Sequence, residues 1–337
     1  MSANGIAHII SGDGSDPVAT KAARQVAKLD IAQAKRQGKT VADNGTISGS
    51  VDSTQTYYRS NNVYDLDALS LAYGTVADSD PLLLSRPWVS VASLAAPTTL
   101  EQALPSTVLL ELESWYDGSD GGEFIPSNPA DGATFTQWTD KSAFAHNANP
   151  IGGATTRASY QTSEQNTLSV VRFDGNDGLS INPYASLASA PALTIVVVMK
   201  MTATTGNPRV WTTNSGLTEL YYDSTASKFV AKAAGGVGTS TVANAAGFHI
   251  HSFAFDGTQT TNAASLKYRY DKTDITLSFT GTVGDALGAS NTTLYIGNAN
   301  GANFFTGDIA EFLVFTKALT ATQLSNVENY LSTKWGL

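Results

Sequence analysis

The 337-residue chain contains no cysteine, few charged residues and no long apolar run. Without cysteine it has no disulfide framework, no thiolate zinc site and no cysteine nucleophile. No segment approaches the roughly 18 consecutive apolar residues that a membrane-spanning helix needs. The first residues also lack the basic and apolar regions of a secretory signal. We therefore expect no membrane insertion and no export by a signal peptide.

Charge is scarce and mostly negative. Charged residues make up 15% of the chain, and the formal net charge is −9. Binding to nucleic acid requires a dense basic surface that neutralises phosphates, so we expect no nucleic-acid partner. The composition includes 29 glycines among abundant serine, threonine and asparagine, which is typical of an all-β protein rich in turns.

Residues 1–104 predict an anchoring arm that begins with a basic helix over about 17–37. Residues 21–39 carry a local net charge of +5, so the remainder of the chain carries −14. Two interpretations stay open: a face that is solvated or folded back on the chain's own acidic domain, or a surface that docks on an acidic partner. The anchor candidates in this helix are Lys21, Arg24, Lys28, Lys35 and Arg36.

The segment that follows the helix, residues 41–104, is irregular and has too little periodic apolar surface to build a core. Tyrosine and tryptophan interspersed with polar residues are typical of a segment that lies along another protein. Its anchor candidates are Tyr57, Tyr58, Tyr64, Arg86 and Trp88.

From residue 105 onward, short apolar segments alternate with turns, which predicts an all-β sandwich of two antiparallel sheets over 105–337. The run from Leu193 to Met199 is apolar except for Thr194 and predicts a central strand packed on both faces. The expected strands are 108–116, 135–139, 169–173, 193–202, 209–213, 218–223, 228–233, 248–255, 265–270, 276–279, 293–297 and 307–315.

A helix is expected to close the chain. Thr320 and Gln323 form a capping box, and Gly336 suits the end of the helix. Its apolar face should cover an open end or an edge of the sandwich; the residues on this face are Leu324, Val327, Leu331 and Trp335.

Five short motifs occur in order along the second segment. They are LESWYDGSD at 112–120, WTDKS at 138–142, VRFDGND at 171–177, FHIHSFAFDG at 248–257 and GDIAEFLVF at 307–315. With the closing helix, they resemble the concanavalin A-like lectin and glucanase superfamily, in particular LamG-type jelly rolls. The resemblance implies a concanavalin A-like jelly-roll sandwich with a short C-terminal helix.

The first residues carry a second resemblance. MSANGIAH at 1–8 and ATKAARQ at 19–25 are similar to the start of virion structural proteins of tailed bacteriophages, including cyanophage-type viruses. This resemblance implies a protein that is made in the host cytoplasm, is located in the virion and is released by lysis.

A glycan site would need an aromatic side chain beside amide and carboxylate groups, placed on loops or on a sheet face. Tyr221 and Tyr222 are neighbours on one expected strand and point to opposite faces, so at least one of them should be structural. The sequence does not separate binding residues from core or interface aromatics. The candidates are Trp211, Tyr221, Tyr222, Asp223, Asn298, Asn300, Asn303, Phe304 and Phe305.

Two further kinds of site need weighing. Asp174, Asn176 and Asp177 offer oxygen ligands for Ca²⁺, although the same residue types also form turns.

The glucanases use two carboxylates about 5 Å apart, in a strand motif with three acids. Glu111 and Glu113 match two of these positions, but position 116 is tyrosine. We therefore expect a solvent-facing pair, no catalytic residue and no required cofactor.

These observations favour a non-enzymatic virion structural protein of the tail, baseplate or capsid. Its arm would anchor it, and its jelly roll would be displayed for contact with proteins or glycans. The expected partners are other virion proteins, in a homo-oligomer or a lattice, and a host-surface glycan. The alternatives are a free carbohydrate-binding lectin and a glycoside hydrolase of the glucanase type.

Overall fold

The computed structural model describes residues 40–41, 47–48, 99–104 and 106–337. The chain divides into two units, Met1–Ala95 and Ala96–Leu337, a division that precedes the predicted boundary at 104/105. In the first unit only strands β1 (Thr40–Val41) and β2 (Ile47–Ser48) are described, and they pair antiparallel. The predicted basic helix and all ten anchor candidates lie outside the described residues.

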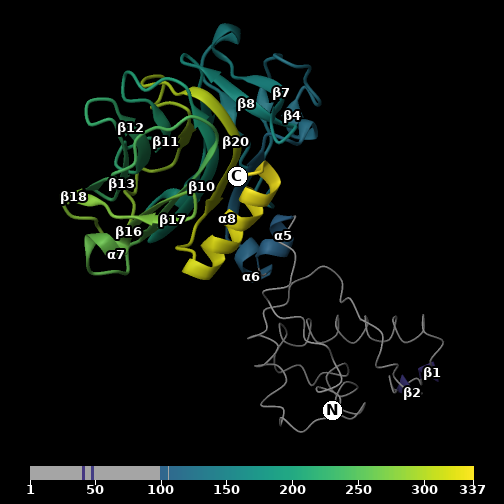
Figure 1. Ribbon diagram of the computed structural model, residues 1–337. Coiled ribbons are helices and arrows are strands. Elements are labelled where there is room, and N and C mark those ends of the chain that lie inside the picture. Colours follow the sequence, from purple (N-terminus) through teal and green to yellow (C-terminus); the bar gives the residue numbers. More distant parts are fainter. Residues whose placement is uncertain (1–39, 42–46, 49–98, 105) are drawn as a thin grey trace. The chain divides into compact units, whose positions relative to one another are not determined.

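The second unit is a sandwich of two antiparallel sheets, as predicted (Figure 1). In sheet I the strands lie in the order β17 (Thr273–Ile275), β16 (Leu266–Tyr270), β15 (His249–Asp256), β10 (Ala192–Met201), β20 (Thr306–Phe315), β8 (Leu168–Asp174) and β7 (Ser159–Gln165), with β3 (Leu112–Asp117) also paired to β20. In sheet II the order is β18 (Ser278–Thr280), β14 (Gly236–Thr239), β13 (Lys228–Ala233), β12 (Glu219–Asp223), β11 (Arg209–Thr213), β19 (Leu294–Ile296), β9 (Leu179–Ile181) and β6 (Asn149–Pro150).

The remaining elements are short, apart from one helix. A two-stranded pair joins β4 (Phe124–Ile125) to β5 (Gln137–Trp138). The helices are α5 (Leu100–Ala103), α6 (Ser106–Leu109), α7 (Asn262–Ser265) and α8 (Ala321–Trp335), with 3₁₀ turns at Gly121–Glu123, Ala154–Thr156 and Ala185–Leu187. None of the described helices is long and apolar enough to cross a membrane.

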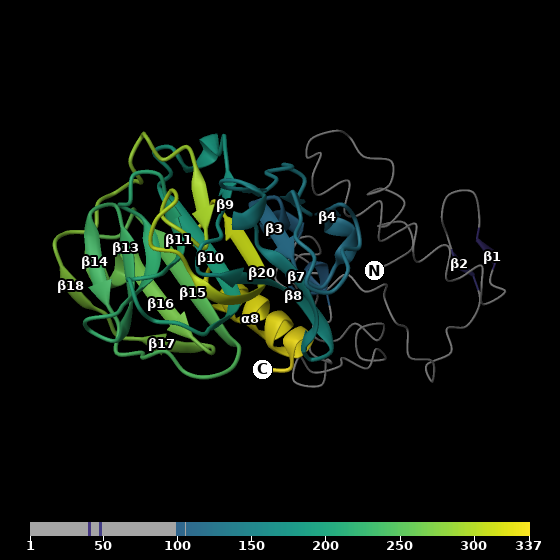
Figure 2. The same ribbon diagram turned by 90° about the horizontal axis from the view of Figure 1, so that it is seen from above.

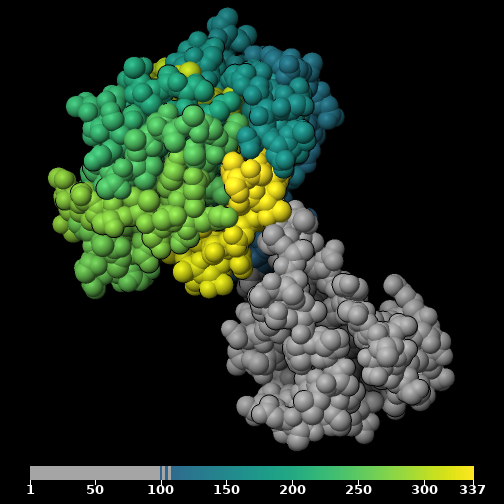
Figure 3. Space-filling model, viewed as in Figure 1, coloured from purple at the N-terminus to yellow at the C-terminus, as the bar shows by residue number. Residues whose placement is uncertain are grey.

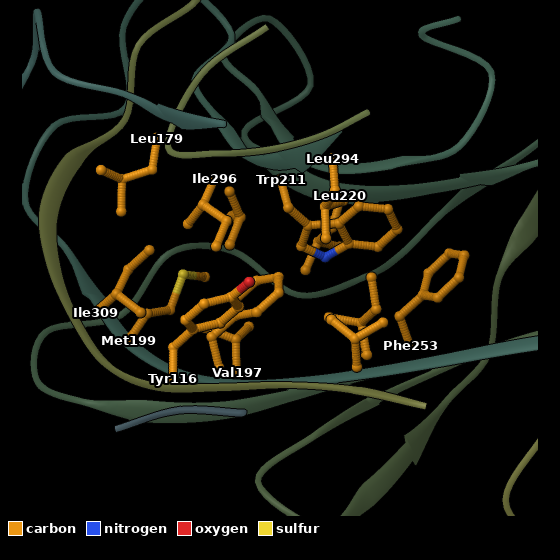
Figure 4. Close-up of a cluster of buried hydrophobic side chains, with 14 of the residues drawn as sticks. Tyr116, Leu179, Val197, Met199, Trp211, Leu220, Phe253, Leu294, Ile296 and Ile309 are labelled. Carbon is orange, nitrogen blue, oxygen red and sulfur yellow. The ribbon is translucent and has the colours of Figure 1, made fainter. Parts of the chain in front are cut away.

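Strand β10 is apolar on both faces because it separates two cores. Leu193, Ile195 and Val197 point into the interior core between the sheets, which Figure 4 shows in close-up. Val196 and Val198 point the other way, into a second core on the outer face of sheet I. The predicted central strand is therefore confirmed, and its composition requires a cover on each side of sheet I.

Helix α8 supplies most of the second cover. Thr320 accepts a hydrogen bond from the Gln323 backbone, the Gln323 side chain accepts one from the Thr320 backbone, and Gly336 ends the helix in the left-handed region. The four residues of the predicted apolar face are buried in the second core. The helix lies across the outer face of sheet I, not on an open end or an edge as predicted (Figure 2), and it forms a yellow band at the surface in Figure 3.

The short helices α5 and α6 complete this cover. Leu100, Ala103 and Leu104 are buried in the second core beside Val108. The expected strand 108–116 was wrong in its first part, because residues 106–109 are helical and β3 begins only at Leu112. Residues just before the predicted boundary at 104/105 thus contribute to the core of the sandwich.

A buried carboxylate ties α8 to sheet I. In the pairing of β10 with β20, Val198 lies opposite Glu311 and Met199 lies opposite Ile309, so Ala310 is an extra residue in β20. At this irregularity the Glu311 side chain points toward the helix. Its carboxylate accepts four hydrogen bonds, with donor–acceptor distances of 2.7 to 2.9 Å. The donors are Trp115 Nε1, Tyr330 Oη, Lys334 Nζ and Trp335 Nε1.

We expect Glu311→Ala to lower the free energy of unfolding by about 3–5 kcal/mol, because it leaves the buried indole N–H of Trp335 and that of Trp115 without this acceptor. It also removes one of the two carboxylates paired with the Lys334 ammonium. Asp274→Ala is the matched control. It removes an exposed acid paired with Arg269 at 3.1 Å, and it should cost under about 1 kcal/mol. Urea unfolding of both variants measures the difference, and equal costs would contradict a stabilising role for the Glu311 contacts.

Candidate functional site

The outer face of sheet II carries a compact group of polar and aromatic side chains. Leu220 and Tyr222 of β12 lie in the interior core, so strand alternation places Glu219 and Tyr221 on the outer face. The pairing of β12 with β13 sets Glu219 opposite Lys232. The helices that form the second core all lie on sheet I, on the other side of the sandwich (Figure 2).

Glu219 is the centre of this group, and its side chain is only 3% exposed. Its carboxylate accepts hydrogen bonds from Arg209 Nε at 3.0 Å and from Lys232 Nζ at 2.8 Å. Thr212 Oγ1 donates a third, weaker bond at 3.4 Å. A buried carboxylate requires such partners, and here two cations serve one acid.

Arg209 also stacks on an aromatic ring. Its guanidinium carbon lies 4.2 Å from the centroid of the Tyr221 ring, and its Nη1 donates to the carbonyl of Asn207 at 2.7 Å. Burial, and then the charge of Glu219, raises the pKa of Tyr221, so the phenol stays neutral. Stacking, pairing and the backbone contact hold the guanidinium in one orientation. We call Arg209, Thr212, Glu219, Tyr221 and Lys232 the Arg209 cluster.

Neutral groups extend the same face toward the other edge of sheet II. In register across the strands, Thr212 faces Tyr295 of β19, Tyr295 faces Ser180 of β9, and Ser180 faces Asn149 of β6. Tyr295 and Ser180 are half-buried, and Asn149 is exposed. The face therefore combines two tyrosines, hydroxyl and amide groups and a fixed guanidinium, which can pair with hydroxyl-bearing ligands.

The structure corrects several sequence candidates because their side chains lie inside the sandwich. Trp211 is fully buried and packs edge-on against Phe253 at 4.9 Å, so it offers no ring face to a ligand. Tyr222 is buried against Phe229 at 5.2 Å, which makes it the structural member of the tyrosine pair. Phe305 is buried against Phe173 at 5.9 Å.

Two polar candidates serve the chain itself. Asp223 Oδ1 accepts hydrogen bonds from the backbone N–H groups of Thr225 and Ala226, and so forms the turn after β12. Asn298 is fully buried, and its amide donates to the carbonyl of Ile296 while its oxygen accepts from Gly301 N. Each polar group therefore holds the backbone of its sequence neighbours, Asp223 that of Thr225 and Ala226, and Asn298 that of Gly301.

The loop between β19 and β20 keeps three candidates at the surface. Asn300 and Asn303 are exposed and adopt left-handed backbone conformations, and Phe304 is half-buried. The carbonyl of Asn303 accepts a hydrogen bond from the Arg209 backbone N–H at 2.9 Å. This contact brings the loop beside the first residue of β11 and therefore beside the Arg209 cluster.

The calcium candidates form a hydrogen-bonded turn. Asp177 Oδ2 accepts from the Asp174 backbone N–H at 2.8 Å, and the Asn176 amide nitrogen can donate to both carboxylates at 3.1 and 3.2 Å. No group of three or more histidine, cysteine, aspartate or glutamate residues in the described part of the chain is placed to hold a metal. The turn that was the alternative to a calcium site is therefore present, and calcium binding here stays untested.

The two acids of the hydrolase alternative are arranged differently from the expected solvent-facing pair. Glu113 is buried, and its Oε1 lies 3.6 Å from His146 Nδ1. Glu111 is half-buried in the turn before β3. The absence of catalytic activity stays a prediction.

The neighbouring WTDKS motif has a structural role. Both oxygens of Asp140 accept hydrogen bonds, from the Trp115 and His146 backbones and from the backbone and hydroxyl of Ser142. The motif therefore fastens residues 138–146 to β3.

No protein-family model matches the sequence, and no curated protein matches it. Among solved structures, domain 4 of AbnA, a GH43 extracellular arabinanase from Geobacillus stearothermophilus in complex with arabinotriose, is 12% identical, with a TM-score of 0.45 over 65% of this chain and 98% of that one. Trypanosoma rangeli sialidase is 14% identical, with a TM-score of 0.44 over 72% of this chain and 36% of that one.

The binding domain of botulinum neurotoxin DC in complex with SialylT is 11% identical, with a TM-score of 0.44 over 66% of this chain and 52% of that one. This chain therefore spans about a third of the sialidase and about half of the neurotoxin domain. These are distant likenesses, and they concern the fold alone.

The sequence analysis selected Tyr221 but missed its partners Arg209, Glu219 and Lys232. A usable signal was present, since the expected strand 218–223 has two acids four residues apart and the next strand, 228–233, has two lysines with the same spacing. A hairpin that pairs Asp223 with Lys228 necessarily sets Glu219 opposite Lys232.

We expect Asp177 to make the protein less stable as the pH rises from about 4 to about 6. Burial and the neighbouring Asp174 raise its pKa to about 6, above its ordinary value of 3.8. Between these values the unfolded chain has released the proton while the folded chain keeps it, so a rise in pH favours unfolding by about 2 kcal/mol.

Asp177→Asn removes this titration and retains a side-chain oxygen for the Asp174 backbone. Urea unfolding of both proteins between pH 4 and pH 6.5 should show the difference in stability changing with pH. A constant difference would contradict the shifted pKa.

Proposed function

We propose that the sandwich is a non-catalytic saccharide-binding module whose binding face is the outer face of sheet II, centred on Tyr221. The observation that carries the proposal is the Arg209 cluster, a preorganised group of an aromatic ring, a guanidinium and an ammonium on a sheet face that no part of the second core uses. Saccharides are bound by aromatic rings beside convergent hydrogen-bonding groups, and this face supplies both.

The surrounding surface fits the same proposal. Tyr295, Ser180 and Asn149 follow the cluster in register, and the carbonyl of exposed Asn303 accepts a hydrogen bond from the Arg209 backbone. Such a row offers successive sugar units an aromatic ring, hydroxyl groups and amides. On the opposite side of the sandwich, α8 and the second core occupy the outer face of sheet I.

We further propose that this module belongs to a virion structural protein of a tailed bacteriophage and that residues 1–104 anchor it there. The support comes from the sequence: the +5 charge of residues 21–39, the aromatic segment that follows, and the lack of cysteine. The partners on this proposal are other virion proteins, and the ligand is a glycan of the host surface.

The binding proposal is tested with the full-length protein on an array of bacterial surface polysaccharides. We expect Tyr221→Ala to weaken binding of any retained glycan roughly tenfold, because it removes the ring and loosens the guanidinium. Phe144→Ala is the control, since Phe144 is an exposed aromatic outside the Arg209 cluster. Unchanged binding by Tyr221→Ala, at an unchanged melting temperature, would refute this location of the site.

The anchoring proposal is tested with residues 96–337 alone. In the part of the chain that the structure describes, both cores are built from residues at or after Leu100, so the fragment should fold and melt cooperatively. Without the arm it should be missing from particles that assemble in its presence, whereas the full-length chain is incorporated. Quantitative mass spectrometry of purified particles measures this, and equal incorporation of fragment and full-length chain would contradict the anchoring role.

A further inference from the structure

The Arg209 cluster differs from the other ion-pair networks of the described residues in its charge balance. Two cations, Arg209 and Lys232, share the single acid Glu219. The other networks pair Lys141 and Lys334 with Asp117, Asp120 and Glu311; Arg172 and Lys200 with Glu164 and Asp308; and Arg269 with Asp274 and Glu328. Acids equal or outnumber cations in each of these, so among the Lys and Arg ion-pair networks of the described residues only the Arg209 cluster carries excess positive charge.

This excess is presented to solvent. The Glu219 side chain is 3% exposed, whereas those of Arg209 and Lys232 are 16% and 21% exposed. The acid is therefore covered and the two cations are on the surface. On a chain with a net charge of −9, a locally positive spot on one sheet face is unlike its surroundings.

Hydrogen-bond donors remain on both cations. Of the five guanidinium N–H groups of Arg209, two bond Glu219 and one bonds the carbonyl of Asn207. The ammonium of Lys232 has three N–H groups, and these contact Glu219 and the carbonyl of Gly216. Two guanidinium donors and one ammonium donor are thus left for a further acceptor.

We propose that the Arg209 cluster binds the carboxylate of an acidic saccharide, such as a uronic acid or nonulosonic acid residue. This inference rests on the proposed saccharide-binding function and names its ligand class. A carboxylate accepts paired N–H bonds from a planar guanidinium, and it neutralises the excess charge that Glu219 leaves. Tyr221 fixes the guanidinium plane beforehand, which lowers the entropy cost of binding.

The test measures binding of full-length protein to oligosaccharides of polygalacturonate, alginate and polysialate, each beside its carboxyl-reduced counterpart. A sulfated neutral galactan is included to separate carboxylate recognition from general attraction of anions. We expect at least one acidic ligand to bind roughly tenfold or more tightly than its reduced form, and more tightly than the sulfated galactan.

Three variants locate the effect. Lys232→Gln and Arg209→Lys should each weaken binding of the acidic ligand roughly tenfold, the second because lysine keeps the charge but loses the paired donors. Lys267→Gln is the charge-matched control, because Lys267 is exposed on β16 of sheet I, and it should leave binding unchanged. Melting temperatures confirm that each variant is folded.

The outcomes separate this inference from the proposed function. Equal affinity for acidic and reduced ligands, with binding still lost in Tyr221→Ala, overturns the acidic ligand class and leaves the saccharide site standing. Equal losses in Lys232→Gln and Lys267→Gln, or preference for the sulfated galactan, also overturn it. No binding to any saccharide of the panel or the array refutes both.

Discussion

The fold depends on one constraint: strand β10 and its neighbour β20 are apolar on both faces, so sheet I must be covered on both sides. Sheet II covers one side through the interior core, and α8 with α5 and α6 covers the other through the second core. Burial of each large apolar side chain contributes about 1.5–3 kcal/mol, so leaving either face exposed would cost more than the net stability of a typical domain. The middle of the outer face of sheet I is therefore occupied by this cover, and the second core does not extend to the outer face of sheet II.

Buried carboxylates are the second organising feature, and they act differently on the two sheets. Glu311 receives hydrogen bonds from β3 and α8 and so fastens the cover to sheet I. Glu219 receives its partners from strands of its own sheet and fastens no cover. Its two cations instead remain at the surface, held in place by the acid beneath them. The same physical requirement, that a buried charge be paired, stabilises a core in one place and preorganises a surface in the other.

Much of the fold could be predicted from the sequence, because local pattern and tertiary packing agree. Strands β11 and β13 begin and end at the predicted residues, and the capping box of α8 forms as expected.

The errors lie where one pattern permits two structures. Residues 108–111 are apolar enough for a strand but pack as helix and turn. The expected strand 276–279 is confirmed only in its second half, which belongs to β18, whereas residues 276–277 cross from β17 of sheet I to β18 of sheet II. Four of the nine glycan candidates proved to be buried, namely Trp211, Tyr222, Asn298 and Phe305. The type of an aromatic or amide residue does not by itself indicate whether its side chain points into the core or to the surface.

The central claim is that ligand binds on the outer face of sheet II, and hydroxyl-radical footprinting of the full-length protein with a bound acidic oligosaccharide tests it most directly. Tyr221 and Tyr295 are half-buried on that face, and Trp115 is half-buried on β3 of sheet I. The account predicts that ligand slows oxidation of the two tyrosines and leaves oxidation of Trp115 unchanged. Protection of Trp115 with unchanged oxidation of Tyr221 and Tyr295 would contradict it.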